Sequence, residues 1–475
     1  MGGVSIVISS KKQNILKIFE MMESLKHRGS FFGVALKNEV FTSKKIKELK
    51  LKELKAETII GYNFFNEPRL NAPQPIKIDD YIYIFEGEIF LDEKIINAEN
   101  FPKIESKKDL IDFLSVNDGA YVFTLLLNNE LLIARDPLGL KPLYYWGNKD
   151  FHVLASEKKA LWQIGVKKPK VFPPGVIAEF KNGKLFFKKF KKLVYPKVEF
   201  NSSDKAAEKI SNLLLASIKK RSLDLKEAAV AFSGGIDSSL IAYILNKLGV
   251  KVELFTVGIK ERFDCTIVKK AAEELNLPLE IQLFTIDELK KIVKKVLWII
   301  EEPNLMKLDV GIPVFWVSNL ASQKGFKKIF FGQGADELFG GYRKFATILI
   351  EEGSAACFKA LFQSVAKAYK ENYERDEKIA AYNKIALRLP YTDWNLINYA
   401  VKLPIELKIK NEDLRKIVLR EAAKLLGLPK NLIEAKKKAI QYETGVHKSL
   451  IKILKPNLKN RLNQLFNDLL KHYPL

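Results

Sequence analysis

The chain has 475 residues, of which 79 are lysine or arginine and 56 are aspartate or glutamate, so its formal net charge at pH 7 is +23. This length is ample for two domains, and no apolar run reaches the roughly 18 residues that a membrane span needs. Two cysteines and four histidines provide neither a disulfide framework nor a zinc site. The start of the chain lacks the basic segment of a signal peptide, and we expect a cytoplasmic protein.

The first part of the chain is rich in short predicted strands rather than in βαβ units. Several are joined by turns such as Asn182-Gly183. The predicted strands cover residues 81–90, 121–127, 130–134, 152–155, 176–180 and 185–190. We predict an antiparallel, β-rich sandwich domain over residues 1–195. Its boundary lies in the polar stretch 191–204, which contains Pro196 and precedes the first long helix.

The second part, residues 196–475, alternates strands with helices. Apolar β-prone runs predict strands, and one helix is predicted over residues 266–276. The predicted strands cover residues 228–232, 252–258, 279–284 and 328–331. Such alternation is typical of a doubly wound parallel sheet, which binds ligands at the carboxyl ends of its strands. The loops that follow residues 232 and 331 are therefore the candidate site.

The first of these loops, residues 233–239, has the sequence Ser-Gly-Gly-Ile-Asp-Ser-Ser and leads into a helix. Gly234 and Gly235 allow backbone N–H groups to close around an anion, and free amides at a helix start favour negative charge. Asp237 is itself an anion, so beside a polyphosphate its sensible role is to hold Mg²⁺. The loop predicts a nucleotide site with its metal; the alternative is an ordinary turn capped by Asp237. Further hydrogen bonds can come from the hydroxyls of Ser233, Ser238 and Ser239.

A second glycine-rich loop, residues 332–342, follows the predicted strand 328–331. Gly332 presents bare backbone there, and Asp336 adds an acidic side chain at a second strand end. We predict that Asp237 and Asp336 share one Mg²⁺. The alternative is a glycine-rich connection with solvated acids.

The first loop resembles the PP-loop, Ser-Gly-Gly-x-Asp-Ser-Ser, of the ATP pyrophosphatase superfamily. Together the two loops resemble the synthetase domain of class B asparagine synthetases, and the similarity extends through most of the chain. The resemblance implies that ATP is cleaved to AMP and pyrophosphate while a carboxylate is adenylated. It also implies that Ala231, Phe232 and Val257 lie against the adenine, with an ordinary core position as the alternative for Val257.

Two further segments carry this resemblance. Residues 436–446 are similar to the lysine-bearing segment of the family, where an ammonium stabilises developing charge. Lys437 and Lys438 compete for that role, with a solvated lysine cluster as the alternative. In the second loop the family has Ser-Gly-Glu-Gly-x-Asp-Glu, and here Phe331 and Gln333 replace the Ser and the first Glu. Gln333 can position substrates through hydrogen bonds but cannot accept a proton.

The first domain resembles the glutamine amidotransferase domain of the same synthetases, an N-terminal-nucleophile fold. The similarity lies in residues 27–29 (His-Arg-Gly), 135–145, 155–157 and 172–175.

This amidotransferase domain normally begins Met-Cys-Gly and uses the cysteine as its nucleophile. This chain begins Met-Gly-Gly, and both of its cysteines, Cys265 and Cys357, belong to the second part. Glu86 replaces the family's oxyanion-hole asparagine, and a carboxylate there repels an oxyanion. Lys107 aligns with the aspartate that pairs with the α-amino group of glutamine. We expect this glutaminase site to be inactive.

These features predict an ATP-dependent amide-forming ligase that resembles asparagine synthetase. It would use ATP, Mg²⁺, aspartate or another carboxylic acid, and ammonia. One alternative is a β-lactam-synthetase-like ligase, whose family has a tyrosine at the position of Gln333. Another is a PP-loop tRNA-modifying enzyme, which the charge of +23 favours. No RNA-binding module is recognisable, so we do not expect a nucleic-acid partner. Intact phosphate and metal residues disfavour a pseudoenzyme, and a homo-oligomer is left open.

Overall fold

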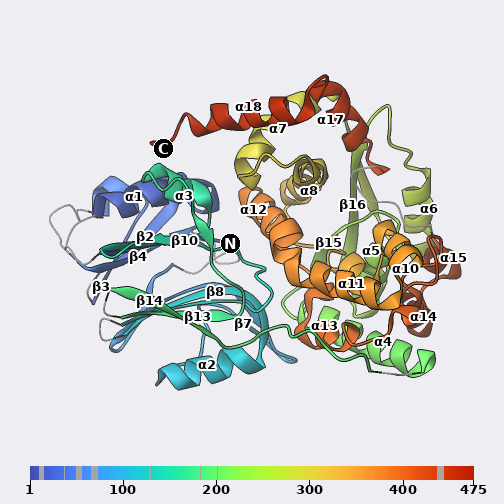
Figure 1. The fold of residues 1–475 in the computed structure, drawn as a ribbon, viewed down its shortest axis with the longest axis horizontal. Coiled ribbons are helices and arrows are strands. Elements are labelled where there is room, and N and C mark those ends of the chain that lie inside the picture. Colours follow the sequence, from blue (N-terminus) through green and yellow to red (C-terminus); the bar gives the residue numbers. More distant parts are fainter. Residues whose placement is uncertain are drawn as a thin grey trace.

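The computed structural model describes residues 1–9, 15–36, 38–49, 56–65, 73–127, 130–181, 183–199, 202–435 and 443–475. Residues up to Lys189 form two antiparallel sheets, and residues from Ser203 onward form a parallel sheet with its helices. Figure 1 shows these two parts side by side. The predicted fold class, an N-terminal-nucleophile-like β-rich sandwich followed by a doubly wound parallel sheet, is confirmed. The division at residues 195 and 196 stays a prediction; it lies between the last strand of the sandwich and the first helix of the second part.

The N-terminal part is a sandwich of two sheets between layers of helix. The first sheet has the order β12-β10-β11-β1-β4-β2-β3, and the second has the order β14-β13-β9-β8-β6-β5 with β7 on β6. Helices α1 and α3 cover the first sheet, and α2 covers the second (Figure 1). The elements are β1 (Gly3–Ser9), α1 (Ile15–Ser24), β2 (Phe31–Leu36), β3 (Glu39–Ser43), β4 (Thr58–Phe64), β5 (Ile76–Ile78), β6 (Tyr81–Phe90), β7 (Ile95–Ile96), α2 (Lys107–Val116), β8 (Asp118–Leu127), β9 (Glu130–Arg135), β10 (Tyr144–Gly147), β11 (Phe151–Ala155), α3 (Lys158–Gln163), β12 (Lys170–Val171), β13 (Val176–Lys181) and β14 (Lys184–Lys189).

Strand β1 shows why this sandwich buries both faces of its first sheet. Val4, Ile6 and Ile8 point into the apolar layer between the two sheets, whereas Val7 packs into the layer beneath α1. Because side chains alternate along a strand, a continuous apolar run is what a strand covered on both sides requires. The sequence prediction named β6 residue for residue, but it did not place β1 to β5.

The second part is built on the sheet β17-β16-β15-β18-β19, in which all neighbours are parallel. The chain leaves β15 toward β16 and β17 and later returns to β18 on the other side, so the order reverses between β15 and β18. The carboxyl ends of these two strands form the crevice where such sheets bind ligands. The strands are β15 (Glu227–Ala231), β16 (Lys251–Ile259), β17 (Leu279–Phe284), β18 (Lys328–Phe330) and β19 (Ala386–Arg388).

Helices surround this sheet on both faces (Figure 1). Helices α11 and α12 follow one another through a π-helical turn, Tyr369–Tyr373, and α18 reaches the sandwich, where Phe466 contacts Trp162 of α3 edge to face. The helices are α4 (Ser203–Lys220), α5 (Ile236–Lys247), α6 (Thr266–Leu275), α7 (Ile286–Ile300), α8 (Leu305–Gln323), α9 (Ala335–Phe339), α10 (Arg343–Glu352), α11 (Ser354–Ala368), α12 (Glu374–Tyr382), α13 (Trp394–Ala400), α14 (Ile417–Leu426), α15 (Lys430–Glu434), α17 (Val446–Leu454) and α18 (Leu458–Leu470).

Helix α12 lies on the side of the second part that faces the sandwich (Figure 1). Its Glu374 accepts hydrogen bonds from Arg135 at 3.0 Å and from the Tyr144 hydroxyl at 2.7 Å. Its Glu377 pairs with Arg28 at 2.6 Å and with Lys141 at 3.1 Å. All of these partners come from the N-terminal sandwich, so buried ion pairs fix α12 to it.

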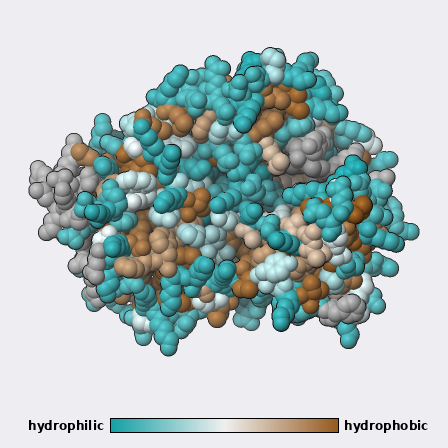
Figure 2. Space-filling model, viewed as in Figure 1, coloured by the Kyte–Doolittle hydropathy of each residue, from teal (hydrophilic) through white to brown (hydrophobic). Residues whose placement is uncertain are grey.

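On the face shown in Figure 2, hydrophilic residues surround smaller groups of hydrophobic ones. Among the residues that the structure describes, no helix combines the length and the apolar character needed to cross a membrane.

Candidate active site

The loop between β15 and α5 has the geometry that its sequence predicts for an anion site. Gly234 has a φ of +71°, and Gly235 is the N-cap residue that immediately precedes α5. The Ser238 hydroxyl accepts from the backbone N–H of Ser233 at 3.3 Å and donates to the carbonyl of Gly235 at 3.2 Å. These bonds close the loop on itself at the helix start, where free amides favour an anion.

The second loop runs from β18 to α9 and lies directly against the first. A Cβ atom at Gly332 would approach the Cβ of Asp237 to 2.9 Å, closer than real Cβ contacts. Only glycine therefore allows the two loops this approach. As a result, Asp237 and Asp336 lie next to each other at the carboxyl ends of β15 and β18, where the strand order reverses (the switch point of the sheet).

The carboxylates of Asp237 and Asp336 share one cation, the ammonium of Lys416. Lys416 Nζ lies 2.7 and 2.6 Å from the two oxygens of Asp237 and 2.6 Å from Oδ1 of Asp336. Its side chain is 2% exposed. The sequence analysis did not identify Lys416, because nothing in its local sequence distinguishes it from the chain's other lysines.

The same pair of carboxylates fits a magnesium ion. Both are oxygen donors of the type that Mg²⁺ prefers, and they already converge on one positive charge. Asp237 and Asp336 would hold the metal, which would neutralise phosphate charge when bound.

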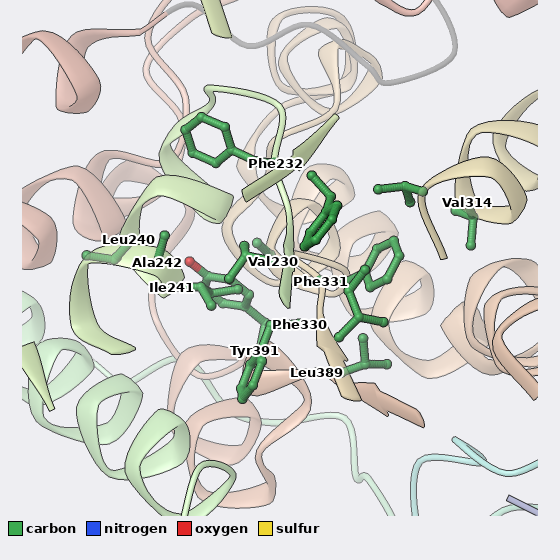
Figure 3. Close-up of a cluster of buried hydrophobic side chains, with 14 of the residues drawn as sticks. Val230, Phe232, Leu240, Ile241, Ala242, Val314, Phe330, Phe331, Leu389 and Tyr391 are labelled. Atoms are coloured by element: carbon green, nitrogen blue, oxygen red, sulfur yellow. The ribbon is translucent and has the colours of Figure 1, made fainter. Parts of the chain in front are cut away.

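The predicted adenine-contacting residues lie at the carboxyl ends of β15 and β16. The N–H of Phe232 donates to the carbonyl of Phe255 at 2.8 Å, and Val257 follows on the same strand. Figure 3 shows Val230 between the side chains of α5 and Phe330, and Phe232 belongs to the same cluster of buried hydrophobic side chains. Phe232 and Val257 are both buried. An adenine contact for Ala231, Phe232 and Val257 stays a prediction.

Gln333 lies in the second loop, and its side-chain Nε2 donates to Oδ2 of Asp376 at 2.7 Å. Asp376 belongs to α12 and is 1% exposed. Sequence analysis missed this partner, which lies 43 residues further along the chain. Lys437 and Lys438, the two candidates for the catalytic lysine, lie outside the described residues.

Comparisons with known proteins agree with this geometry. Residues 209–367 and 351–473 match the family model for asparagine synthase. The chain is 30% identical to a protein of Methanocaldococcus jannaschii named as a putative glutamine-hydrolyzing asparagine synthetase 1, over 98% of each chain. The chain belongs to the asparagine synthase family. It is accordingly an ATP-dependent carbon–nitrogen ligase of the asparagine synthetase type.

Other members of the asparagine synthase family show the same relationship at lower identity. The glutamine-hydrolyzing asparagine synthetase of Brassica oleracea is 26% identical, and the match covers 94% of this chain and 78% of that one. The enzyme of Gallus gallus is also 26% identical, over 84% and 79% of the two chains. Residues 96–163 match the model of a glutamine amidotransferase domain, in agreement with the resemblance seen in the sandwich.

A cavity of about 860 Å³ lies between the sandwich and the second part of this ligase, and Glu86 lines it. The Glu86 side chain is 3% exposed. It accepts a short hydrogen bond from the Tyr62 hydroxyl and pairs with Lys141 at 2.9 Å. Burial alone raises the pKa of Glu86, but attraction to Lys141 and the amino terminus and the bond from Tyr62 bring it down to about 2. A stable negative charge therefore occupies this position.

A side chain at position 2 would require the Tyr62 ring to move. A Cβ atom there would lie 2.1 Å from the Tyr62 hydroxyl oxygen. The His-Arg-Gly segment serves the interface, because Arg28 donates to the carbonyl of Gly2 at 3.1 Å and pairs with Glu157 and Glu377.

Lys107 lies outside the large cavity in this structure, and its alignment with the family's aspartate stays a prediction. Lys107 is the first residue of α2, after the N-cap Ser106, and it pairs with Glu179 of β13. It is not among the residues that line the cavity. In this structure the Lys107 ammonium is directed toward β13.

Replacement of Lys416 tests the shared cation. We expect Lys416→Met to lose about 3 kcal/mol of unfolding free energy in metal-free buffer, because two adjacent carboxylates lose their buried counterion. Added Mg²⁺ should recover more stability in this variant than in the unchanged protein. Urea unfolding with EDTA or Mg²⁺ measures both effects. Lys410→Met, an exposed lysine of the same connection, is the control, and equal losses in the two variants would contradict the assignment.

The lowered pKa of Glu86 predicts acid sensitivity. A carboxyl whose folded-state pKa lies below its ordinary 4.5 stabilises the fold above that pH and loses this contribution as the pH falls toward 2. We expect its contribution to fall by about 2 kcal/mol between about pH 5 and pH 3. Urea unfolding at both pH values should show a smaller pH dependence in Glu86→Gln. The exposed Glu93→Gln should behave as the unchanged protein does; a similar change in both variants argues against the prediction.

Proposed function

We propose that this ligase adenylates the side-chain carboxylate of aspartate and then forms asparagine from free ammonia. The observation that carries the proposal is the convergence of Asp237 and Asp336 on one cation above the PP-loop. This arrangement supplies a phosphate cradle and a cation site at the switch point of the sheet, as an ATP-dependent adenylation requires.

The proposed reaction has two steps. A carboxylate oxygen of aspartate attacks the α-phosphorus of ATP, the bond to the bridging oxygen breaks, and pyrophosphate leaves. Ammonia then attacks the acyl carbon, a C–N bond forms, AMP leaves with the electrons of the broken C–O bond, and one proton passes to water. Backbone amides and hydroxyls of residues 233–239 would bind the phosphates, while the Lys416 ammonium offsets acidic charge beside them.

We propose that the N-terminal sandwich does not hydrolyse glutamine. Two observations support this restriction: the buried Glu86 carboxylate would repel an oxyanion, and Tyr62 fills the space that a side chain at Gly2 would need. The described cysteines, Cys265 and Cys357, both belong to the second part of the chain. Ammonia would therefore enter as the free molecule.

Pyrophosphate exchange tests the adenylation. We expect labelled pyrophosphate to enter ATP only when aspartate and Mg²⁺ are present, because exchange requires reversible formation of the acyl-adenylate. A screen of carboxylic acids, with glutamate as the control for chain length, identifies the substrate. Exchange with a different acid would overturn the choice of aspartate, and exchange that depends on tRNA would favour RNA modification.

Asparagine formation with different nitrogen sources tests the second claim. With aspartate and ATP, ammonium should yield asparagine, whereas glutamine should yield neither asparagine nor glutamate at rates above the background. Chromatographic assay of the amino acids measures both products. Glutamine used as well as ammonium would show that the N-terminal sandwich retains glutaminase activity.

A further inference from the structure

The contact between Gln333 and Asp376 fixes the direction of the Gln333 amide. A carboxylate only accepts hydrogen bonds, so the amide nitrogen must face Asp376, and Nε2 lies 2.7 Å from Oδ2. The amide oxygen, Oε1, must then point to the other side. Gln333 follows Gly332, which abuts Asp237, so this fixed acceptor belongs to the loop beside the phosphate site.

Asp376 is itself held on both of its oxygens. Arg375 donates from Nε to Oδ1 at 2.7 Å and from Nη2 to Oδ2 at 3.1 Å. Arg375 also donates from Nη1 to the carbonyl of Glu371 at 3.2 Å. A two-point pair between guanidinium and carboxylate restricts orientation as well as distance. Asp376 is thus a fixed negative charge that meets Gln333 from α12.

The opposite side of α12 is fixed by the sandwich. Glu374, Glu377 and Lys378 lie at helical positions i, i+3 and i+4, so they share one face. Glu374 and Glu377 pair with the sandwich residues described above, and Lys378 donates to the Tyr144 hydroxyl at 2.8 Å and to Glu301 at 2.7 Å. The π-helical turn Tyr369–Tyr373 immediately precedes this segment, and such turns are frequent at functional sites. Helix α12 therefore connects the sandwich to Gln333.

We propose that Asp376 is a positioning residue for the amide-forming step, which it serves by holding Gln333 with Oε1 ready to accept a hydrogen bond from the attacking amine. The inference rests on the proposed function. Gln333 takes no proton in this step; it aligns the amine nitrogen with the acyl carbon. The N-terminal sandwich, through its ion pairs with α12, keeps this pair in place without glutamine chemistry.

A double-mutant cycle tests the proposal. In Asp376→Asn the partner of Gln333 becomes an amide, which offers either an oxygen or an NH₂ group, so the direction of Gln333 is no longer imposed. We expect ammonium-dependent amide formation to fall about tenfold more than pyrophosphate exchange. Gln333→Glu alone brings two carboxylates together and should also impair amide formation.

The combined variant Gln333→Glu/Asp376→Asn exchanges the carboxylate and the amide between the two positions. Its helix amide can donate to the loop carboxylate, whose second oxygen again faces the amine. We expect amide formation to recover to within about threefold of the unchanged protein, through a favourable coupling between the sites. Both variants with Asp376→Asn lose the carboxylate that pairs with Arg375, so recovery separates the contact with Gln333 from the loss of that ion pair.

Four outcomes are decisive. Recovery in the combined variant supports the positioning role. A combined variant no better than Asp376→Asn, or an equal loss of exchange and amide formation in Asp376→Asn, overturns it. Absence of exchange in the unchanged protein with every carboxylic acid would instead overturn the proposed function, and the two failures are therefore distinguishable.

Discussion

The buried ion pairs of α12 are the interaction on which the relation between the two halves depends. Three charged side chains on one face of a nine-residue helix meet Arg28, Arg135 and Lys141 of the sandwich and Glu301, which follows α7. Removing such charges from water costs several kcal/mol each, and their attraction offsets that cost only in good geometry. These pairs therefore determine the position and orientation of α12. Each pair forms in only one placement of the helix, and a shift of one residue would leave charges buried without partners.

This constraint gives the amidotransferase-like sandwich a physical role that does not depend on glutamine. The buried carboxylates of Glu86 and Glu157 pair with Lys141 and Arg28, respectively. Both of these cations also pair with Glu377 of α12. A neutral residue at position 86 would leave Lys141 with less negative charge beside it. The carboxylate that we expect to repel an oxyanion is thus part of the same network that fixes the interface.

The sequence predicted those parts of the site whose residues lie close together in the chain. The loops at residues 233–239 and 332–342 were identified because glycines, hydroxyls and acids follow an apolar strand within a few residues. The strands 81–90 and 279–284 agree with β6 and β17 residue for residue. The helix predicted over 266–276 ends at Leu275, with Asn276 in a left-handed conformation at its end.

The missed residues are those brought to the site over long distances in the chain. Lys416 meets Asp237 across 179 residues, and Asp376 meets Gln333 across 43. Neither has a local pattern that separates it from an ordinary charged surface residue. The contact of Lys107 with Glu179 of β13 is likewise not visible in the local sequence, and the alignment of Lys107 with the family's aspartate stays a prediction.

Lys416 also explains how two acidic loops can lie so close together. Gly332 removes the steric barrier to this approach, but it leaves two carboxylates side by side in a region with little solvent, where their repulsion is stronger than in water. The ammonium of Lys416, held at the start of α14, balances that repulsion from within the chain. The two strand ends can therefore adopt the spacing of a nucleotide site before any metal is present. Gly332 and Lys416 together make the pair of carboxylates compatible with a stable fold, and this pair is the proposed metal site.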